Sequence, residues 1–344
     1  MADPGAAFAE GTPCWTDAML PDLEAGKRFY GELFGWTYGD PAPPARGSYT
    51  VARLDGGRAA GLSHKPDGRL PTAWTVYFAA SDAWAAAERV RAAGGQLVTE
   101  PAPVGTAGTV ATAVDPGGAA FGLWQRGTLA GFEVTRRPGS YVWTEVCTRE
   151  KAAVDAFYAE VFGFGMYPAG RGAGEAAEAP ERERTAPEDA AAATAGTAGT
   201  AETVAAVEVA EAEIPGEPED AVLREAGEGA GAPDTPSDAS PETAPDVSPD
   251  AASDVMVWVP AGAPADDAYA VGSRTMIDDT YPVEMPAHFL VYFAVADCDA
   301  AVRTTVRLGG RTVEGPRDTP FGRYAVLMDN QGARFGVLDT STAS

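Results

Sequence analysis

The chain has 344 residues, of which 45% are hydrophobic, and this is enough for two packed domains of ordinary size. Its 25 basic and 50 acidic side chains give a formal charge of -25, which argues against nucleic acid as a partner, because phosphate binding depends on Lys and Arg. Three cysteines without a C-x-x-C pair indicate neither a disulfide framework nor a cysteine zinc site, and they are typical of a reducing cytoplasm, where we expect the protein.

The chain begins with residues 1–10, which we expect to form a flexible N-terminus. They carry acidic residues where a secretory signal needs basic ones. The sequence has no run of 18 apolar residues, so we expect no membrane partner. The first half of the module that follows, residues 11–126, predicts a strand over 13–19, a helix over 23–33 ended by Gly35, and strands at 37, 48–54 and 58–63. Its second half predicts a strand over 74–79, a helix over 82–93 capped by Asp82, and strands near 96, 110 and 121.

A linker over 127–138 leads to the second module, residues 139–340, which is followed by a tail over 341–344. Residues 171–254 interrupt this module with 84 positions that include no aromatic residue, 21 acidic residues and 4 basic ones. A segment with so little apolar area does not gain enough from burial to offset the entropy that a chain loses on folding. We therefore expect a disordered insert, with at most a transient helix near Thr200–Ala212.

The two modules repeat one another. The segment GTPCWTDAMLPDLEAGKRFYGELFGW from Gly11 aligns with GSYVWTEVCTREKAAVDAFYAEVFGF from Gly139 at an offset of 128. Later segments align at an offset of 214 or 215, and this change is close to the length of the insert. Each module also contains a strand, a helix and three strands, twice over. We therefore predict an α+β fold of two tandem modules, each a pair of β-α-β-β-β units that form one curved, eight-stranded cup.

Four motifs resemble those of the vicinal oxygen chelate superfamily. They are F-Y-x-x-x-F-G after the first strand, Y-F-x-x-x-D before the second helix, G-G at the end of that helix, and D-P-x-G-x-x-F-G-L-W in the last strand of the first module. The superfamily includes glyoxalase I, bleomycin-resistance proteins and extradiol dioxygenases. The chain is most similar to its two-module actinobacterial members, which carry the label hydroxylase.

The resemblance implies where a metal would be held, because catalytic members usually bind a divalent metal with His and Glu on facing strands of the cup. By motif spacing these positions fall on Trp15, Thr75, Gly122, Trp143, Leu290 and Gly336. None of these side chains chelates well, so we expect no metal and no other cofactor. The alternative is a displaced divalent metal site that uses His288 and Glu145, while His64 lies in a polar turn and is expected to face solvent.

Alternation along the strands sends rings and acids to one face, which is the concave one in the family's geometry. The candidate ligand-binding residues of the two cups are Trp15, Asp17, Thr75, Tyr77, Trp124, Trp143, Glu145, His288 and Tyr292. Asp17, Glu145 and His288 are also the candidate catalytic residues, because burial beside tryptophan raises the pKa of a carboxyl group. The alternative is that the rings fill the cups as core and the acids are simply hydrogen-bonded.

Three functions fit these residues. The first is binding of a small aromatic or cationic molecule in the cups without a metal, as in bleomycin-resistance proteins. The second is catalysis as a lyase, isomerase or oxygenase with a displaced metal site. The third is a scaffold whose acidic insert contacts a partner. We expect either a monomer with an internal pseudo-dimer or a homodimer.

Overall fold

The computed structural model describes residues 8–39, 49–65, 71–169, 255–279 and 281–343. The insert over 171–254, the helix considered within it and most of the N-terminal segment lie outside these ranges. In the described part of the chain, no helix is long and apolar enough to cross a membrane.

The strands form two eight-stranded sheets, one from each half of the chain. The first contains β1 Pro13–Leu20, β2 Thr37–Tyr38, β3 Thr50–Leu54, β4 Gly57–His64, β5 Trp74–Ala79, β6 Gln96–Val104, β7 Gly108–Val114 and β8 Ala120–Arg126. The second contains β9 Tyr141–Thr148, β10 Gly165–Pro168, β11 Met256–Val259, β12 Gly272–Met276, β13 His288–Ala294, β14 Arg311–Thr319, β15 Gly322–Met328 and β16 Arg334–Asp339. The helices are α1 Leu23–Phe34, α2 Ala83–Ala92, α3 Lys151–Phe162 and α4 Cys298–Arg307, with short 3-10 turns η3 Asp267–Tyr269 and η4 Thr340–Thr342.

The two sheets have the same strand order. It is β2-β3-β4-β1-β5-β8-β7-β6 in the first and β10-β11-β12-β9-β13-β16-β15-β14 in the second. The central pair of each sheet is antiparallel, β1 with β5 and β9 with β13, and each member of that pair has a parallel partner on its other side. This architecture confirms the predicted α+β fold of two tandem modules.

Local sequence signals explain where the first module's helices begin and end. The side chain of Asp22 accepts a hydrogen bond from Ala25 N at the start of α1, and Gly35 ends the helix with φ 74°, a left-handed conformation that favours glycine. Asp82 caps α2 by accepting from the backbone N–H groups of Trp84 and Ala85. The predicted glycine at the end of α1 and the predicted cap of α2 are therefore confirmed.

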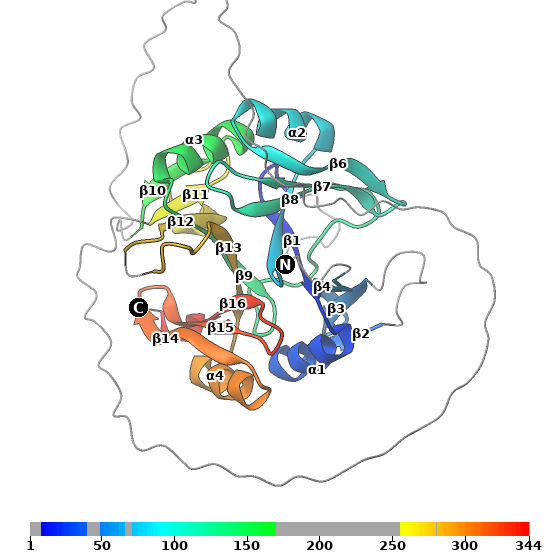
Figure 1. Ribbon diagram of the computed structural model, residues 1–344, viewed down its shortest axis with the longest axis vertical. Helices are drawn as coiled ribbons and strands as arrows, with labels where there is room; N and C mark the ends of the chain where they lie inside the picture. Colours follow the sequence, from blue (N-terminus) through cyan, green and yellow to red (C-terminus); the bar gives the residue numbers. More distant parts are fainter. Residues whose placement is uncertain (1–7, 40–48, 66–70, 170–254, 280, 344) are drawn as a thin grey trace, which may run out of the picture.

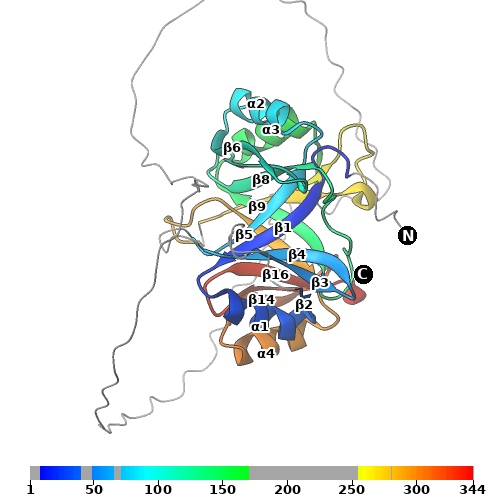
Figure 2. The same cartoon turned by 90° about the vertical axis from the view of Figure 1, so that its right-hand side faces the viewer.

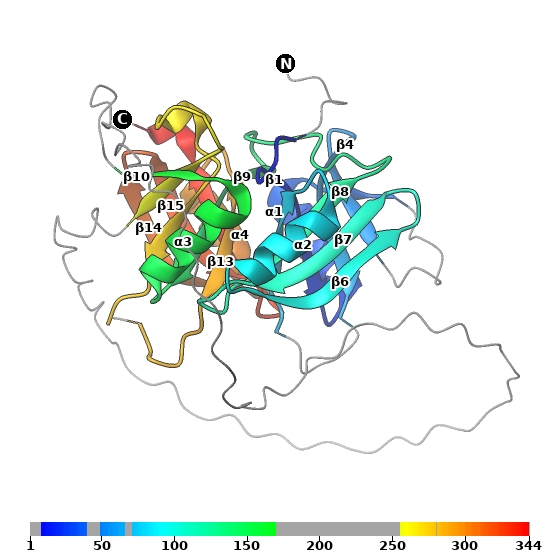
Figure 3. The same cartoon turned by 90° about the horizontal axis from the view of Figure 1, so that it is seen from above.

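The helices lie between the two modules and join them into one core. Helices α2 and α3, from different modules, lie together at one end of the molecule, and α1 and α4 lie together at the other end (Figures 1 and 2). From above, the two modules lie side by side (Figure 3). Phe34 of α1 packs against Phe293 and Phe335 of the second sheet, and Phe162 of α3 packs against Phe78 of the first. Helices α1 and α3 thus contribute aromatic side chains that pack against the sheet of the other module.

Two matched hydrogen bonds cross between the modules. Tyr30 donates to the Oδ2 atom of Asp329 at 2.8 Å, and Tyr158 donates to the Oδ2 atom of Asp115 at 3.1 Å. The two tyrosines belong to the F-Y motif and the two aspartates open the last-strand motif, so both motifs serve the docking of the modules. All four side chains are buried, and burial raises the pKa of both carboxyl groups.

Candidate functional site

The concave face of the second sheet lines a cavity of about 680 Å³. Its floor is made by alternate residues of β9, β13 and β16, namely Trp143, Glu145, Cys147, His288, Leu290, Tyr292, Arg334 and Leu338. The residues between them, such as Val146, Val291 and Phe335, point the other way and are fully buried in the core. Strand alternation therefore separates the chemistry of the cup from the packing of the core.

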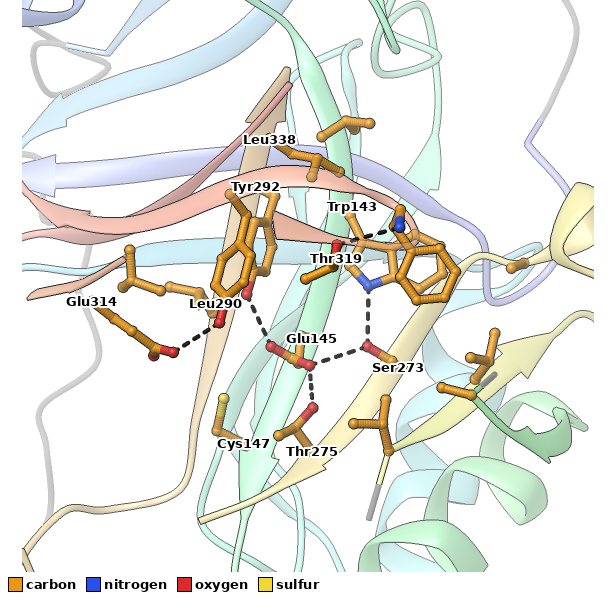
Figure 4. A pocket seen from close by; sticks show the side chains of 18 of the residues that line it. Trp143, Glu145, Cys147, Ser273, Thr275, Leu290, Tyr292, Glu314, Thr319 and Leu338 are labelled. Atoms are coloured by element: carbon orange, nitrogen blue, oxygen red, sulfur yellow. Dashed lines mark hydrogen bonds between the residues drawn. The ribbon is translucent and has the colours of Figure 1, made fainter. Parts of the chain in front are cut away.

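Glu145 lies on the central strand of this cup and accepts hydrogen bonds from three hydroxyl groups (Figure 4). Tyr292 donates to Oε2 at 3.0 Å, Thr275 donates to Oε1, and the Oγ atom of Ser273 lies 3.5 Å from Oε1. The indole N–H of Trp143 donates to Ser273 at 3.0 Å and so orients that hydroxyl toward the carboxyl group. Burial raises the pKa of Glu145 although these hydrogen bonds oppose the shift, so its proton exchanges at a higher pH than that of an exposed glutamate.

Glu314 of β14 is a second carboxyl group on the wall of the cavity. Tyr324 donates to its Oε1 atom at 2.8 Å, and Tyr281 donates to Oε2 at 3.3 Å. Arg317 forms an ion pair with it at 3.4 Å. The charge of Glu314 adds to the rise in the pKa of Glu145. The two acids of the cup therefore have different environments.

Two further cavity residues have restricted chemistry. The Nδ1 atom of His288 lies 3.0 Å from the carbonyl oxygen of Pro286, and burial, assisted by the charge of Arg334, lowers the pKa of the imidazole. Burial raises the pKa of Cys147 well above its usual value, with Glu145 adding to the shift, so this residue is a neutral thiol rather than a nucleophile.

In the first module, side chains of the module itself occupy the corresponding place. Tyr49 accepts a hydrogen bond from the indole N–H of Trp15 at 2.7 Å and lies 3.2 Å from the Oδ2 atom of Asp17. Tyr77 donates to the Oδ1 atom of Asp17 at 3.2 Å. Burial raises the pKa of Asp17 to about 7, while both tyrosine hydroxyls act in the opposite direction. Trp15 and Asp17 are 4% and 9% exposed, so little of either reaches solvent.

Matched positions explain why one cup is filled and the other is open. In the register of the sheets, Tyr49 corresponds to Val255, because each lies two residues before the valine that pairs with Gly61 or Ser273. A Cβ atom on Gly61 would lie 1.9 Å from the Tyr49 hydroxyl, so glycine is needed there, whereas Ser273 stands free of such a ring. The repeat also places Leu338 where the first module has the larger, buried Trp124.

The residues at the family's metal-ligand positions do not fit a divalent metal. The indole N–H of Trp143 donates a hydrogen bond and has no lone pair to offer. Gly336 lies beneath the ring of Tyr292, since a Cβ atom there would lie 2.1 Å from the ring, and Gly122 has the same relation to Tyr77 at 2.0 Å. A metal-binding glutamate at either glycine would collide with these rings. Among the described residues, no group of three His, Cys, Asp or Glu side chains could hold a metal ion.

The predicted site residues therefore divide between two environments. Trp143, Glu145, His288 and Tyr292 line the cavity, whereas Trp15, Asp17, Thr75, Tyr77 and Trp124 belong to the first cup and do not line it. His64 is exposed at the end of β4.

Most polar residues of the cavity were not predicted from the sequence, among them Ser273, Thr275, Glu314, Tyr324 and Arg334. No motif marks these residues. One usable signal was the repeat itself, which pairs Arg334 with Ala120 and so shows a charge present in one module alone.

Comparisons with known proteins agree with the fold. Residues 15–123 match the family model described as Glyoxalase/Bleomycin resistance protein/Dioxygenase superfamily. The anthracycline biosynthesis protein DnrV of Streptomyces peucetius is 31% identical over 346 residues, which cover 96% of this chain and 94% of the relative.

Two solved structures share the architecture at low identity. The 2,3-dioxygenase LapB from Pseudomonas sp. KL28 superposes with a TM-score of 0.52 at 12% identity, covering 97% of this chain and 93% of that one. The Mn(II)-bound glyoxalase from Novosphingobium aromaticivorans gives 0.51 at 12% identity, covering 98% and 87%. With the motifs, the two cups and a relative aligned over nearly its whole length, the chain belongs to the Glyoxalase/Bleomycin resistance protein/Dioxygenase superfamily.

Proposed function

We propose that the protein binds a small, flat aromatic molecule in the cup of its second module, without a metal ion. The observation that carries this proposal is the difference between the cups. The second holds a cavity of about 680 Å³, within the usual range of small-molecule pockets, whereas side chains of the first module occupy the matched place.

The lining of the cavity favours an aromatic ligand over a cationic one. Trp143, Tyr281, Tyr292, Phe321 and Tyr324 supply ring surfaces, and stacking between rings contributes about 0.5 to 1.5 kcal/mol beyond buried area. A positively charged ligand is less favoured, because Arg334 lines the same cavity and burial raises the pKa of Glu145. The name of the relative DnrV, an anthracycline biosynthesis protein, also supports a flat aromatic ligand.

The metal-assisted lyase, isomerase or oxygenase finds less support, because the donor set of the cup does not suit a divalent metal. The scaffold function leaves the open cup without a purpose. It depends on the insert at 171–254, which lies outside the described residues.

The test converts the second cup into a copy of the first. The double variant Val255→Tyr/Ser273→Gly introduces the tyrosine and the glycine that accommodate each other in the first module. We expect it to fold, because the first module already contains this pair, and to lose at least about tenfold in affinity, or 1.4 kcal/mol, for naphthols and anthraquinones that raise the melting temperature of the parent.

Tyr49→Val is the matched control in the first cup. Calorimetry on both variants, with circular dichroism to verify folding, decides between the cups. Unchanged affinity in the double variant, or a loss confined to Tyr49→Val, would move the site away from the second cup. If no aromatic compound in such a set raises the melting temperature, the proposed function is wrong.

A further inference from the structure

One cation lies in the same row of the second cup as Glu145. The β9–β13 register pairs Glu145 with Leu290, and the β13–β16 register pairs Tyr292 with Gly336. Counting two residues back along the parallel strands β13 and β16 places Arg334 beside Leu290. Glu145 and Arg334 therefore lie on the two strands that flank β13. Twice the usual spacing between neighbouring strands puts their Cα atoms roughly 10 Å apart. Their side chains both line the cavity, so a ring above Leu290 would lie between them.

Arg334 is available to a ligand. Within the part of the chain that the structure describes, it forms no ion pair, whereas Arg323 and Arg274 are each held by aspartates. Its charge also reaches the other groups of the cup, because it acts on the pKa of both His288 and Cys147. An unpaired guanidinium in an apolar cavity favours an oxygen atom that carries or develops negative charge.

The first module lacks this arrangement. The residue matched to Arg334 is Ala120, while Asp17 occupies the place of Glu145. An acid and a cation are therefore combined in the cup that holds the cavity and not in the filled one. Packing does not explain this difference, because a charged side chain on the wall of an apolar cavity is costly to desolvate unless it meets a partner.

We propose that the second cup catalyses a proton shift between two carbon atoms of an enolisable aromatic carbonyl compound, with Glu145 carrying the proton and Arg334 binding the carbonyl oxygen. This inference rests on the proposed function, because the substrate must first bind as an aromatic ligand of that cup.

The reaction balances without an oxidant or a further reactant. The carboxylate of Glu145 removes a proton from the carbon next to the carbonyl group. The electron pair of that C–H bond forms a C=C bond, and the π pair of the carbonyl moves to oxygen, where Arg334 stabilises the enolate. The carboxylic acid of Glu145 then returns the proton to the far carbon of a conjugated system. This step restores the carbonyl group and the carboxylate, so substrate and product are isomers.

The surroundings of Glu145 suit this role. Its raised pKa makes it a stronger base, once ionised, than an exposed glutamate, and a base works best when its pKa lies near the working pH. Tyr292, Thr275 and Ser273 hold the carboxyl group in place, so that little reorganisation accompanies the transfer.

The experiment uses the full chain and 1-phenylbut-3-en-1-one, an aryl ketone whose double bond moves into conjugation when one proton shifts. Isomerisation is followed by ultraviolet absorbance, and binding is measured by calorimetry with 2-tetralone, which cannot complete the shift. We expect isomerisation above the buffer rate, and a loss of at least about 100-fold in kcat for Glu145→Gln, the usual scale of general base catalysis, with the affinity for 2-tetralone within threefold of the parent.

Arg334→Met should lower kcat by about 100-fold, and Arg334→Lys should restore part of it. The control is Glu160→Gln, an exposed carboxyl group on α3 of the same module, which should retain the parent rate. If the ketones bind but no reaction depends on Glu145, this inference is wrong and the proposed function stands. If naphthols bind and the ketones do not, the inference is again overturned alone. If neither class binds, both proposals fail.

Discussion

The hydrogen bonds that join the modules yield a prediction whose size follows from the structure. Tyr158→Phe removes the hydroxyl that donates to the buried carboxyl group of Asp115, and Tyr30→Phe removes the one that donates to Asp329. A hydrogen bond to a charged group contributes about 1.5 to 3 kcal/mol, and we expect Tyr158→Phe to lower the free energy of unfolding by that amount.

Tyr30→Phe should cost more. The hydroxyl of Tyr30 also accepts a hydrogen bond from the indole N–H of Trp74 at 3.1 Å, and this buried donor would lose its partner as well. An unsatisfied buried donor costs about 1 to 3 kcal/mol in addition. The two modules lose one link in each variant, so the order of the two effects, Tyr30→Phe above Tyr158→Phe, is the specific expectation.

Urea unfolding followed by fluorescence and circular dichroism measures these differences. Tyr141→Phe is the matched control, because Tyr141 is buried and its hydroxyl has no hydrogen-bond partner among the described residues. Removing that hydroxyl should leave the free energy of unfolding unchanged or raise it slightly. If Tyr158→Phe is no more destabilising than Tyr141→Phe, the link between the F-Y motif and module docking is refuted.

Three further predictions concern protonation, metal content and the insert. The pKa of Asp17 is raised from 3.8 to about 7, so its contribution to the free energy of unfolding is complete below pH 3.8 and is lost as the pH rises toward 7. Between these pH values the free energy of unfolding of the parent should therefore fall by about 4 kcal/mol relative to that of Asp17→Asn, as measured by urea titrations. A difference between the two proteins that does not change with pH would contradict the shift. Protein purified without chelator should contain no stoichiometric Zn, Fe or Mn by elemental analysis, whereas about one equivalent that disappears in Glu145→Gln would revive a displaced metal site. Replacing residues 171–254 by a short Gly/Ser linker should keep the melting temperature within about 3 °C, because Ala169 N donates to Val255 O at 3.0 Å across the ends of the insert, and a drop above about 10 °C would show that the insert is structural.

The sequence predicted the fold because the relevant signals are local. Alternation with period two marks Trp143 and Glu145 as residues of one strand face, and capping residues such as Asp82 and Gly35 mark helix ends wherever they occur. A repeat of both patterns, with an offset that changes by about the length of the insert, is sufficient for two equivalent sheets. The sequence also shows glycines, Gly122 and Gly336, at the family's glutamate positions. The reason for these glycines, a tyrosine ring that packs on each, appears only in the structure.

The site was predicted in part. Alternation placed Glu145, His288 and Tyr292 on the face of a cup, and these residues line the cavity. Alternation also placed Asp17 on the face of a cup, but Asp17 does not line the cavity. The alternation along a strand does not show which side chains cover that strand. Tyr49, the residue before β3, covers Asp17 although the two lie 32 positions apart in the sequence.

The sequence by itself determined the two modules and the order of helices and strands along each half, because these depend on neighbours a few positions apart or on the internal repeat. The resemblance to the family supplied the metal positions and the concave face. Only the tertiary structure decided which cup is open, what Glu145 contacts and how the modules are joined. Those outcomes depend on side chains that meet across strands and across modules, such as Tyr292 with Glu145 and Tyr158 with Asp115, and such contacts depend on packing that no local pattern encodes.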